Sequence, residues 1–213
     1  MDGRLLQLAD SAFPAGSFAH SSGLEALRQL GQLTGEAALS LRLEELCWSL
    51  SLGALPFLVA AFQGEARAAD EASDAFLSSH VANRASRAQG QAFLLAAEAM
   101  LALPAVTALR AELPCGHVAV AMGAALAPAG FLLDDVRRLF VFGAVRSALS
   151  AAVRLGVTGP LRAQRVLFDL HPVMARALEA SAGRSPGDAV SASPLLDLAQ
   201  AAQDRLYSRL FQS

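Results

Sequence analysis

The sequence predicts an all-α protein, a single compact bundle of about eight to ten helices. Apolar residues recur at helical spacing along most of the chain, as Leu39, Leu43 and Leu46 do. That spacing places them on one face of a helix, and the strict alternation of a half-buried strand is found nowhere between turn residues. Helix starts are also marked, for example by Ser193 followed by Pro194. These observations together indicate amphipathic helices packed around one core.

The N-terminal part of the chain predicts two short helices separated by a loop. Residues 3–9 carry leucines in a helical pattern. Pro14 and Gly16 interrupt the stretch that follows, which we expect to be a loop anchored by its phenylalanines. A hydroxyl residue, Ser21 or Ser22, begins the second helix.

The remaining helices are runs of helically spaced apolar residues bounded by glycine and proline. The run at 136–155 follows Asp134 and Asp135, is apolar nearly all round, and is expected to be the central buried helix. Gly53 and Pro56 are expected to end or kink the helix in which they lie. The expected helices cover residues 3–9, 21–30, 36–52 with its continuation at 57–62, 65–79, 80–103, 105–113, 116–126, 136–155, 161–182 and 194–213.

Two glycines inside helices predict close packing, since glycine there costs about 1 kcal/mol relative to alanine. Gly90 and Gly143 are therefore expected where another helix approaches. Arg146, within the central helix, needs a partner because a buried unpaired charge is costly. Arg84 and Arg87 share one face of the helix 80–103. That face is either solvated or makes polar contacts across a subunit boundary.

Composition limits the function classes. Apolar residues make up 54% of the chain and charged residues 17%, which favours a protein whose surface is largely covered by partners. The net charge of −2 argues against a nucleic-acid-binding protein. The chain has no lysine, so it has no phosphate-binding loop and no lysine Schiff base. Nor does any serine–histidine–acid order or pair of carboxylates predict an active site.

Cysteine usage and hydropathy favour a soluble cytoplasmic protein. Cys47 and Cys115 are too few for a disulfide framework. No basic region precedes an apolar stretch at the N-terminus, so no signal peptide is expected. The long uncharged run 113–133 is broken by prolines and glycines, which argues against a membrane span.

The histidines and the second cysteine are weak metal candidates. Cys115 and His117 are ligand types, but two ligands with no further cysteine or histidine nearby fall short of a site. His20 stands alone, and a lone histidine is more often a hydrogen-bonded structural residue. Both interpretations stay open for these three residues.

The C-terminal stretch 194–213 is expected to form one helix, tethered by the flexible loop 183–193. Tyr207 and Phe211 lie four apart and would widen its apolar stripe just where the chain ends. Terminal turns fray unless something holds them, so these rings need a surface. That surface is either the protein's own body, residues 1–193, or another chain.

Several of these features resemble the urease accessory protein family UreF. The similarity runs in order over essentially the whole chain, so it is specific as a set. The Ser17, Ala202 and Gln203 positions differ from the pattern expected of the family. The matching residues are Leu5 to Ser11; Pro14, Gly16, Phe18, His20, Ser21, Gly23, Leu24 and Glu25; Arg84 to Leu94; Leu113, Pro114, Gly116, His117 and Gly123; Ala152 to Leu155, Gly159, Gln164 and Arg165; and Tyr207 to Phe211 with Ser213.

The resemblance implies a helical, non-enzymatic protein of the machinery that loads nickel into urease. It implies a homodimer that binds a UreD-like (UreH-like) accessory protein through the C-terminal segment. It also implies that this complex recruits and modulates the UreG-like GTPase and delivers nickel to apo-urease, with no resident cofactor. By motif match, the partner-binding residues would be Tyr207, Ser208, Arg209, Leu210 and Phe211, with Arg84, Arg87, Gln89, Pro14, Gly16, Phe18, His20 and Glu25.

Two rival functions remain. A stand-alone nickel carrier would bind the ion through Cys115, His117 or His20. A small helical enzyme would turn over a substrate unaided, with a pH-dependent role for His20 or His117. Nickel binding and turnover by the isolated chain would separate these functions from a scaffold.

Overall fold

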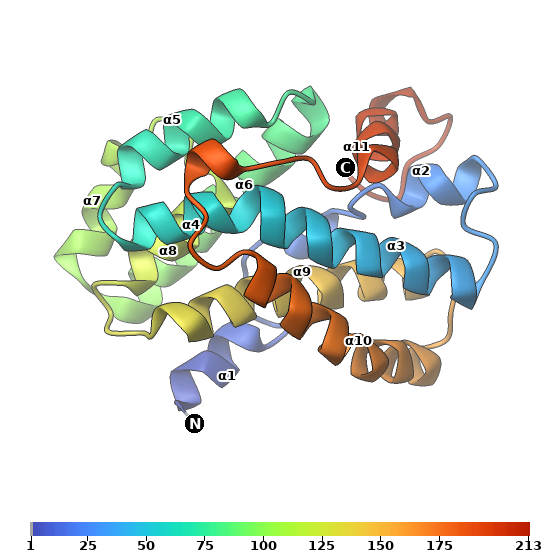
Figure 1. Ribbon diagram of the computed structural model, residues 1–213, viewed down its shortest axis with the longest axis horizontal. Coiled ribbons are helices and arrows are strands. Elements are labelled where there is room, and N and C mark those ends of the chain that lie inside the picture. The colour runs from blue at the N-terminus through green and yellow to red at the C-terminus, as the bar shows by residue number, and fades with distance from the viewer. Residues whose placement is uncertain (1) are drawn as a thin grey trace.

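The computed structural model describes residues 2–213, and within them it is all-helical, with no strand (Figure 1). The predicted fold class is confirmed. In chain order the helices are α1 (Gly3–Ala9), α2 (Leu24–Gln29), α3 (Glu36–Ser49), α4 (Leu55–Phe62), α5 (Ala66–Phe76), α6 (His80–Leu101), α7 (Pro104–Glu112), α8 (Val118–Leu126), α9 (Leu133–Arg154), α10 (Pro160–Ala180) and α11 (Pro194–Ala201).

The helices are arranged around one long central rod. A π-helical turn, Leu50–Ala54, joins α3 and α4 into a continuous helix, Glu36–Phe62. Helices α5 to α8 gather at one end of this rod, and α2 and α11 pack together at the other (Figure 1). Helix α10 packs against α3 and α9. The start of α2 and the end of the chain therefore lie at the same end of the molecule.

The core centres on α8 and α9. Helix α9 is buried along most of its length, as its composition predicts. Helix α8 is enclosed even more completely, with every residue from Ala119 to Leu126 buried. It packs against α4 on one side and α6 on the other. Small side chains on α8 allow this close approach.

The rod Glu36–Phe62 is long and apolar enough to cross a membrane by composition, the one such helix in residues 2–213. Its buried side chains, among them Leu43, Phe57 and Leu58, belong to the common core. Since α8 and α10 pack against it, the rod is a core helix of this fold. The predicted break near Gly53 and Pro56 is a π-helical turn and not an end.

That turn also anchors the segment between α10 and α11. Pro56 has no N–H to donate to the carbonyl of Leu52. The Leu52 carbonyl instead accepts a hydrogen bond of 3.1 Å from the N–H of Val190. Ser193 adds a bond from its hydroxyl to the carbonyl of Glu45. The loop 183–193, which leads to α11, is therefore held on the body at Val190 and Ser193.

The predicted C-terminal helix 194–213 is too long. Helix α11 ends at Ala201, a single 3-10 turn covers Gln203–Arg205, and the remainder is irregular. The side chain of Gln203 is fully buried, and the backbone N–H groups of Leu210 and Phe211 bond to a side chain of α2. These tertiary hydrogen bonds replace the ones that further helix would have made.

The two glycines that predicted close packing have different surroundings. A Cβ on Gly90 would lie 1.9 Å from the carbonyl oxygen of Gly116, so α6 is tightly apposed to the loop before α8. A Cβ on Gly143 would meet no atom within 4 Å, so the prediction for Gly143 is wrong. A close helix–helix approach lies instead at Gly123, where a Cβ would be 2.2 Å from the Leu58 carbonyl oxygen.

Gly123→Ala is expected to lower the free energy of unfolding by about 2–4 kcal/mol, because the new methyl group meets backbone that cannot move aside. Gly143→Ala is the matched control: in open space it should leave the protein unchanged or stabilise it by up to about 1 kcal/mol. Urea denaturation measures both values. Equal effects of the two substitutions would contradict the packing of α4 on α8.

Candidate functional site

Glu25 organises the end of the chain. It lies in the first turn of α2, and its carboxylate is 3% exposed. Oε1 accepts a hydrogen bond of 2.6 Å from the N–H of Leu210, and Oε2 accepts one of 3.1 Å from the N–H of Phe211. The Gln203 side chain donates to Oε2 at 2.6 Å. A buried carboxylate is costly without such partners, so these bonds hold residues 203–211 against α2.

The last residues pair with the loop before α2. The N–H of Gln212 donates to the carbonyl of Ala19 at 2.8 Å, and the N–H of Ser21 donates to the carbonyl of Ser213. The buried ring of His20 bonds to the Ser213 hydroxyl through Nδ1 at 2.6 Å. Burial, and secondly the positive charge of Arg84, lower the pKa of His20. His20 is thus a neutral hydrogen-bonded residue that fastens the chain end.

Arg154, the last residue of α9, fixes two aromatic rings. Its guanidinium lies 4.0 Å from the ring centre of Phe18 and 4.2 Å from that of Phe211. It also donates to the Phe18 carbonyl at 2.8 Å. Cation–π contacts of this kind contribute about 0.5–2 kcal/mol each. Arg154 therefore ties the loop before α2, which carries Phe18, to the C-terminal segment, which carries Phe211.

Asp204 connects the start of α6 to the C-terminal segment. Its carboxylate pairs with Arg84 at 2.9 Å, with Arg209 at 3.0 Å and with His80 at 3.1 Å. The hydrogen bond from Arg84 is the main reason that the pKa of Asp204 is lowered. The arginine face of α6 is expected from the sequence to be solvated or to make polar contacts across a subunit boundary. Arg84 on that face instead binds the chain's own C-terminal segment. We call Glu25, His20, Arg154, Asp204 and the segment 203–213 the terminal cluster.

The terminal cluster leaves some side chains of the segment exposed and buries others. Tyr207 is fully exposed, and Leu210 is 54% exposed. Phe211 is only 4% exposed. The expectation that Tyr207 and Phe211 share one stripe is wrong, because the backbone between them is not helical. Phe211 docks on the protein's own body, whereas Tyr207 points away from it.

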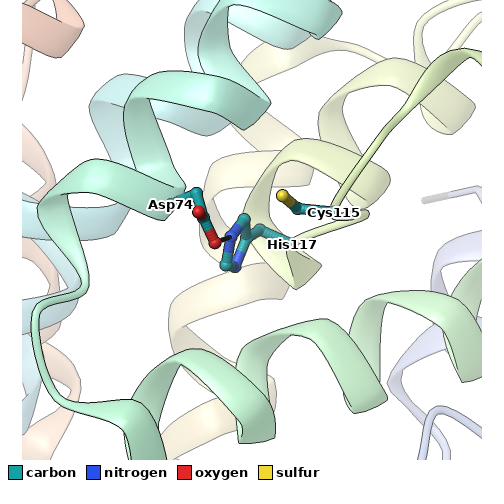
Figure 2. Close-up of side chains that lie close together, drawn as sticks. All are labelled: Asp74, Cys115 and His117. Carbon is teal, nitrogen blue, oxygen red and sulfur yellow. Dashed lines mark hydrogen bonds and ion pairs between the residues drawn. The ribbon is translucent and has the colours of Figure 1, made fainter.

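A second cluster lies before α8, close to the same turns of α6: Arg84 there contacts Asp204, and Asn83 and Arg87 contact Asp74. Figure 2 shows three side chains that point toward one another. Asp74 belongs to α5, and Cys115 and His117 belong to the loop between α7 and α8. The His117 ring is completely buried, with Nε2 3.2 Å from an Asp74 oxygen and Nδ1 3.1 Å from the Ser86 hydroxyl. One ligand atom of each of the three residues lies within 4.8 Å of the others. We call Asp74, Cys115 and His117 the ligand cluster.

The loop that carries Cys115 and His117 is fixed by a buried acid. Asp70 is fully buried and accepts three backbone hydrogen bonds, from the N–H groups of Cys115, Gly116 and His117, at 2.8 to 2.9 Å. Gly116 has φ of +69°, a left-handed conformation that favours glycine. The loop thus presents Cys115 and His117 to Asp74 in one fixed arrangement.

Local electrostatics set the protonation of the ligand cluster. Burial lowers the pKa of His117 and raises that of the Cys115 thiol. The pKa of Asp74 is lowered, first by the hydrogen bond from Asn83 and then by the one from His117. At neutral pH the cluster therefore holds a neutral imidazole, a thiol and a carboxylate. Burial raises the pKa of the other thiol, Cys47, to about 12, and that side chain is inaccessible.

Comparison with known proteins decides the family. The model of the UreF family matches residues 33–171, well over half of the chain. The chain belongs to the UreF family. The urease accessory protein F of Arabidopsis thaliana is 32% identical to it over 97% of this chain and 90% of that protein. The urease accessory protein UreF of Methylobacterium sp. (strain 4-46) is 34% identical over 98% of this chain and 87% of that protein.

As a UreF-family member the chain is an accessory protein of urease and not an enzyme. The alignments with relatives cover 97% of this chain, so the similarity extends well beyond residues 33–171. The relative from Trichodesmium erythraeum, for example, is 29% identical over 97% of this chain and 94% of that protein. The family assignment that the motifs suggested is therefore confirmed.

The structure brings together most of the residues that the UreF-like motifs singled out. Phe18, His20, Glu25, Arg84 and Arg209 belong to or contact the terminal cluster. Of the others, Pro14 and Gly16 are exposed, Gln89 is half-buried, Ser208 is exposed, and Arg87 forms an ion pair with Asp74 at 3.6 Å. The weak metal candidates separate: Cys115 and His117 share the ligand cluster, and His20 is not in it.

Sequence reasoning missed Asp70, Asp74, Arg154 and Asp204 as site residues. Asp70 and Asp74 lie four apart in a helix, which is a signal for one face. Nothing in that spacing, however, identifies the loop that the face contacts. Arg146, which needed a partner, is half-buried and has only a long 3.5 Å contact with the carbonyl of Asp10.

Proposed function

We propose that this UreF-family chain is a scaffold in the maturation of urease. It binds a UreD-like (UreH-like) accessory protein, recruits and modulates a UreG-like GTPase, and helps to deliver nickel to apo-urease in the cytoplasm. The observation that carries the proposal is the terminal cluster, which holds the end of the chain in place and leaves Tyr207 and Leu210 outside.

The exposed pair has the character of a binding anchor. An exposed tyrosine beside a half-exposed leucine buries much apolar area when a partner covers it. Four backbone or side-chain hydrogen bonds to Glu25 and Ala19 fix the segment that carries them, so little conformational entropy is lost on binding. The docking element is therefore a preformed irregular segment and not the amphipathic helix expected from the sequence.

The remaining candidate residues divide by exposure. Ser208 and Arg209 flank the anchor and would contact the partner. We infer that Arg209, through Asp204, also orders the surface that receives the GTPase. His20, Glu25 and the buried Phe211 would act by positioning the segment. Pro14, Gly16, Phe18, Arg84, Arg87 and Gln89 would extend the contact surface, either to a partner or to a second copy in a homodimer.

Tyr207→Ala together with Leu210→Ala is expected to abolish capture of the UreD-like protein, because losing an anchor from an interface costs about 2 kcal/mol or more for each residue. The melting temperature should stay at its wild-type value, since neither side chain is in the core. Co-purification with the tagged partner measures binding, and differential scanning calorimetry measures stability.

Leu161→Ala is the matched control, because Leu161 is also exposed but lies on α10. It should leave capture of the partner unchanged. Undiminished capture by the double variant would remove the assignment of the anchor. A large fall in melting temperature would show instead that the two side chains serve the chain's own fold.

A further inference from the structure

We infer that Asp74, Cys115 and His117 form a binding site for a late first-row divalent cation of the class Co²⁺, Ni²⁺ and Zn²⁺. The three residues bring a carboxylate, a thiolate and an imidazole to one point (Figure 2). Thiolate and imidazole donors suit these ions and do not suit Mg²⁺ or Ca²⁺, which take oxygen ligands.

The three ligand atoms would have to move only slightly closer together to bind an ion. In a tetrahedral site with metal–ligand distances near 2.0–2.3 Å, the ligand atoms lie roughly 3.5 Å apart. Here the three atoms lie within 4.8 Å of one another, and the Asp74–His117 pair is already at 3.2 Å. His117 is fixed in the core, whereas the Asp74 side chain is 39% exposed and lies at the surface, where it can shift while it keeps the hydrogen bond from Asn83. An ion would therefore be bound by movement of Asp74 and the Cys115 side chain toward the fixed ring.

The surroundings of the site resemble those that orient metal ligands. The Ser86 hydroxyl bonds to Nδ1 of His117, which leaves Nε2 directed at Asp74. Asn83 donates to the Asp74 carboxylate at 2.8 Å. Hydrogen bonds of this kind fix the orientation of ligating histidines and carboxylates. When an ion binds, the Nε2 position gives up its hydrogen as Nδ1 becomes the donor to Ser86, and the Cys115 proton passes to solvent.

The ligand-bearing loop is preorganised independently of any ion. Asp70 holds the N–H groups of Cys115 and His117 through its buried carboxylate. Gly90 allows α6 to approach the loop, since a Cβ there would lie 2.8 Å from the His117 carbonyl carbon. The loop backbone that carries Cys115 and His117 is thus already ordered. Little further conformational entropy is lost when an ion binds.

The charge balance favours a divalent ion in exchange with solvent. Cys115 thiolate and Asp74 carboxylate together neutralise two positive charges. The guanidinium of Arg87, 3.6 Å from Asp74, opposes the ion, but it is half-exposed and can turn into solvent. Three protein ligands with access from the Asp74 side leave a position for water or an incoming ligand. Such a site suits transfer of the ion better than permanent storage.

The inference rests on the proposed function only for the identity of the ion carried in the cell, which would be nickel. The site itself is tested on the purified full chain without any partner. The chain is stripped with a chelator and titrated with Co²⁺, and then with Ni²⁺ and Zn²⁺ in competition. We expect one ion per chain and a thiolate-to-cobalt charge-transfer band in the near ultraviolet.

Two variants identify the ligands. Cys115→Ser should abolish the charge-transfer band and weaken binding at least tenfold, and Asp74→Asn should weaken binding at least tenfold while the band remains. Both side chains reach solvent, so the metal-free variants should melt like the wild type. The controls are Cys47→Ala, which removes the other thiol, and Asp169→Asn, which removes an exposed acid that pairs with Arg165 on α10. Both should bind the ion as the wild type does.

The result that overturns the site is binding without a thiolate band, or binding that Cys115→Ser leaves unchanged. No binding by the wild-type chain would leave the ligand cluster as a hydrogen-bonded network that only fastens the loop. Failure here is separable from failure of the scaffold, because Cys115→Ser should still capture the UreD-like protein through Tyr207 and Leu210. Loss of capture in Tyr207→Ala with normal Co²⁺ binding would support both proposals.

Discussion

Glu25→Gln is expected to lower the free energy of unfolding by about 2–4 kcal/mol and to weaken binding of the UreD-like partner at least tenfold. The substitution keeps the shape of the side chain but replaces one carboxylate oxygen by an NH₂ group. That group would face N–H donors of Leu210, Phe211 or Gln203, so one or two charge-assisted bonds are lost and a donor is left unpaired. The segment that presents Tyr207 is then no longer fixed.

Urea denaturation measures the loss of stability, and titration calorimetry with the purified partner measures the loss of affinity. Glu112→Gln is the matched control, since Glu112 is exposed at the end of α7. It should leave both quantities unchanged. If Glu25→Gln matched the wild type in stability and in affinity, the buried carboxylate would not be what holds the chain end.

Asp70→Ala is expected to cost about 3–5 kcal/mol of stability, the other large effect in the molecule. Three N–H groups of the loop 115–117 lose their acceptor at once, and two of them are buried. Cobalt binding by the ligand cluster should weaken in parallel, since the loop that carries Cys115 and His117 is released. Thermal denaturation and the cobalt charge-transfer band measure the two effects.

Asp169→Ala is the control for a general effect of removing an aspartate. Asp169 is exposed on α10 and pairs with Arg165, and an ion pair at the surface contributes about 0–1 kcal/mol. The account of the loop is wrong if Asp70→Ala costs no more than Asp169→Ala.

The parts of the fold that the sequence predicts well are those decided by local pattern. The helical spacing of leucines in 36–50 and the small-residue run of 118–126 each lie on a helix. Helix starts at Pro104, Pro160 and Pro194 agree with proline in the first turn, where its missing N–H costs nothing. Such signals depend only on neighbours within a few residues, so one sequence is enough to detect them.

The parts that the sequence does not predict are decided by contacts between distant segments. The apolar spacing of 194–213 is helical, but α11 ends at Ala201, and the backbone N–H groups of Leu210 and Phe211 bond to Glu25 of α2. Gly143 has the same local signal as Gly90, yet only Gly90 meets a neighbouring backbone. Asp74 lies close to Cys115 and His117, which are 41 and 43 positions further along the chain. No local pattern in either segment predicts this contact.

Several residues of the UreF-like motifs lie together in the structure, although they come from distant parts of the sequence. The stretch Phe18 to Glu25, Arg84 of α6 and the final residues are far apart in sequence and meet in the terminal cluster. Residues that depend on one another through hydrogen bonds and ring contacts are constrained as a group. Polar residues in this set, such as Glu25 and His20, serve to position the segment, and Tyr207 and Leu210 remain available outside it.

Amide hydrogen exchange of the free chain tests the central claim, that the end of the chain is folded onto α2 before any partner arrives. The amides of Leu210, Phe211 and Gln212 should be protected in the free wild-type protein and should exchange rapidly in Glu25→Gln, because their acceptors are Glu25 and Ala19. Exchange of these amides at random-coil rates in the free wild-type chain, with protection appearing only when the UreD-like partner is added, would contradict it.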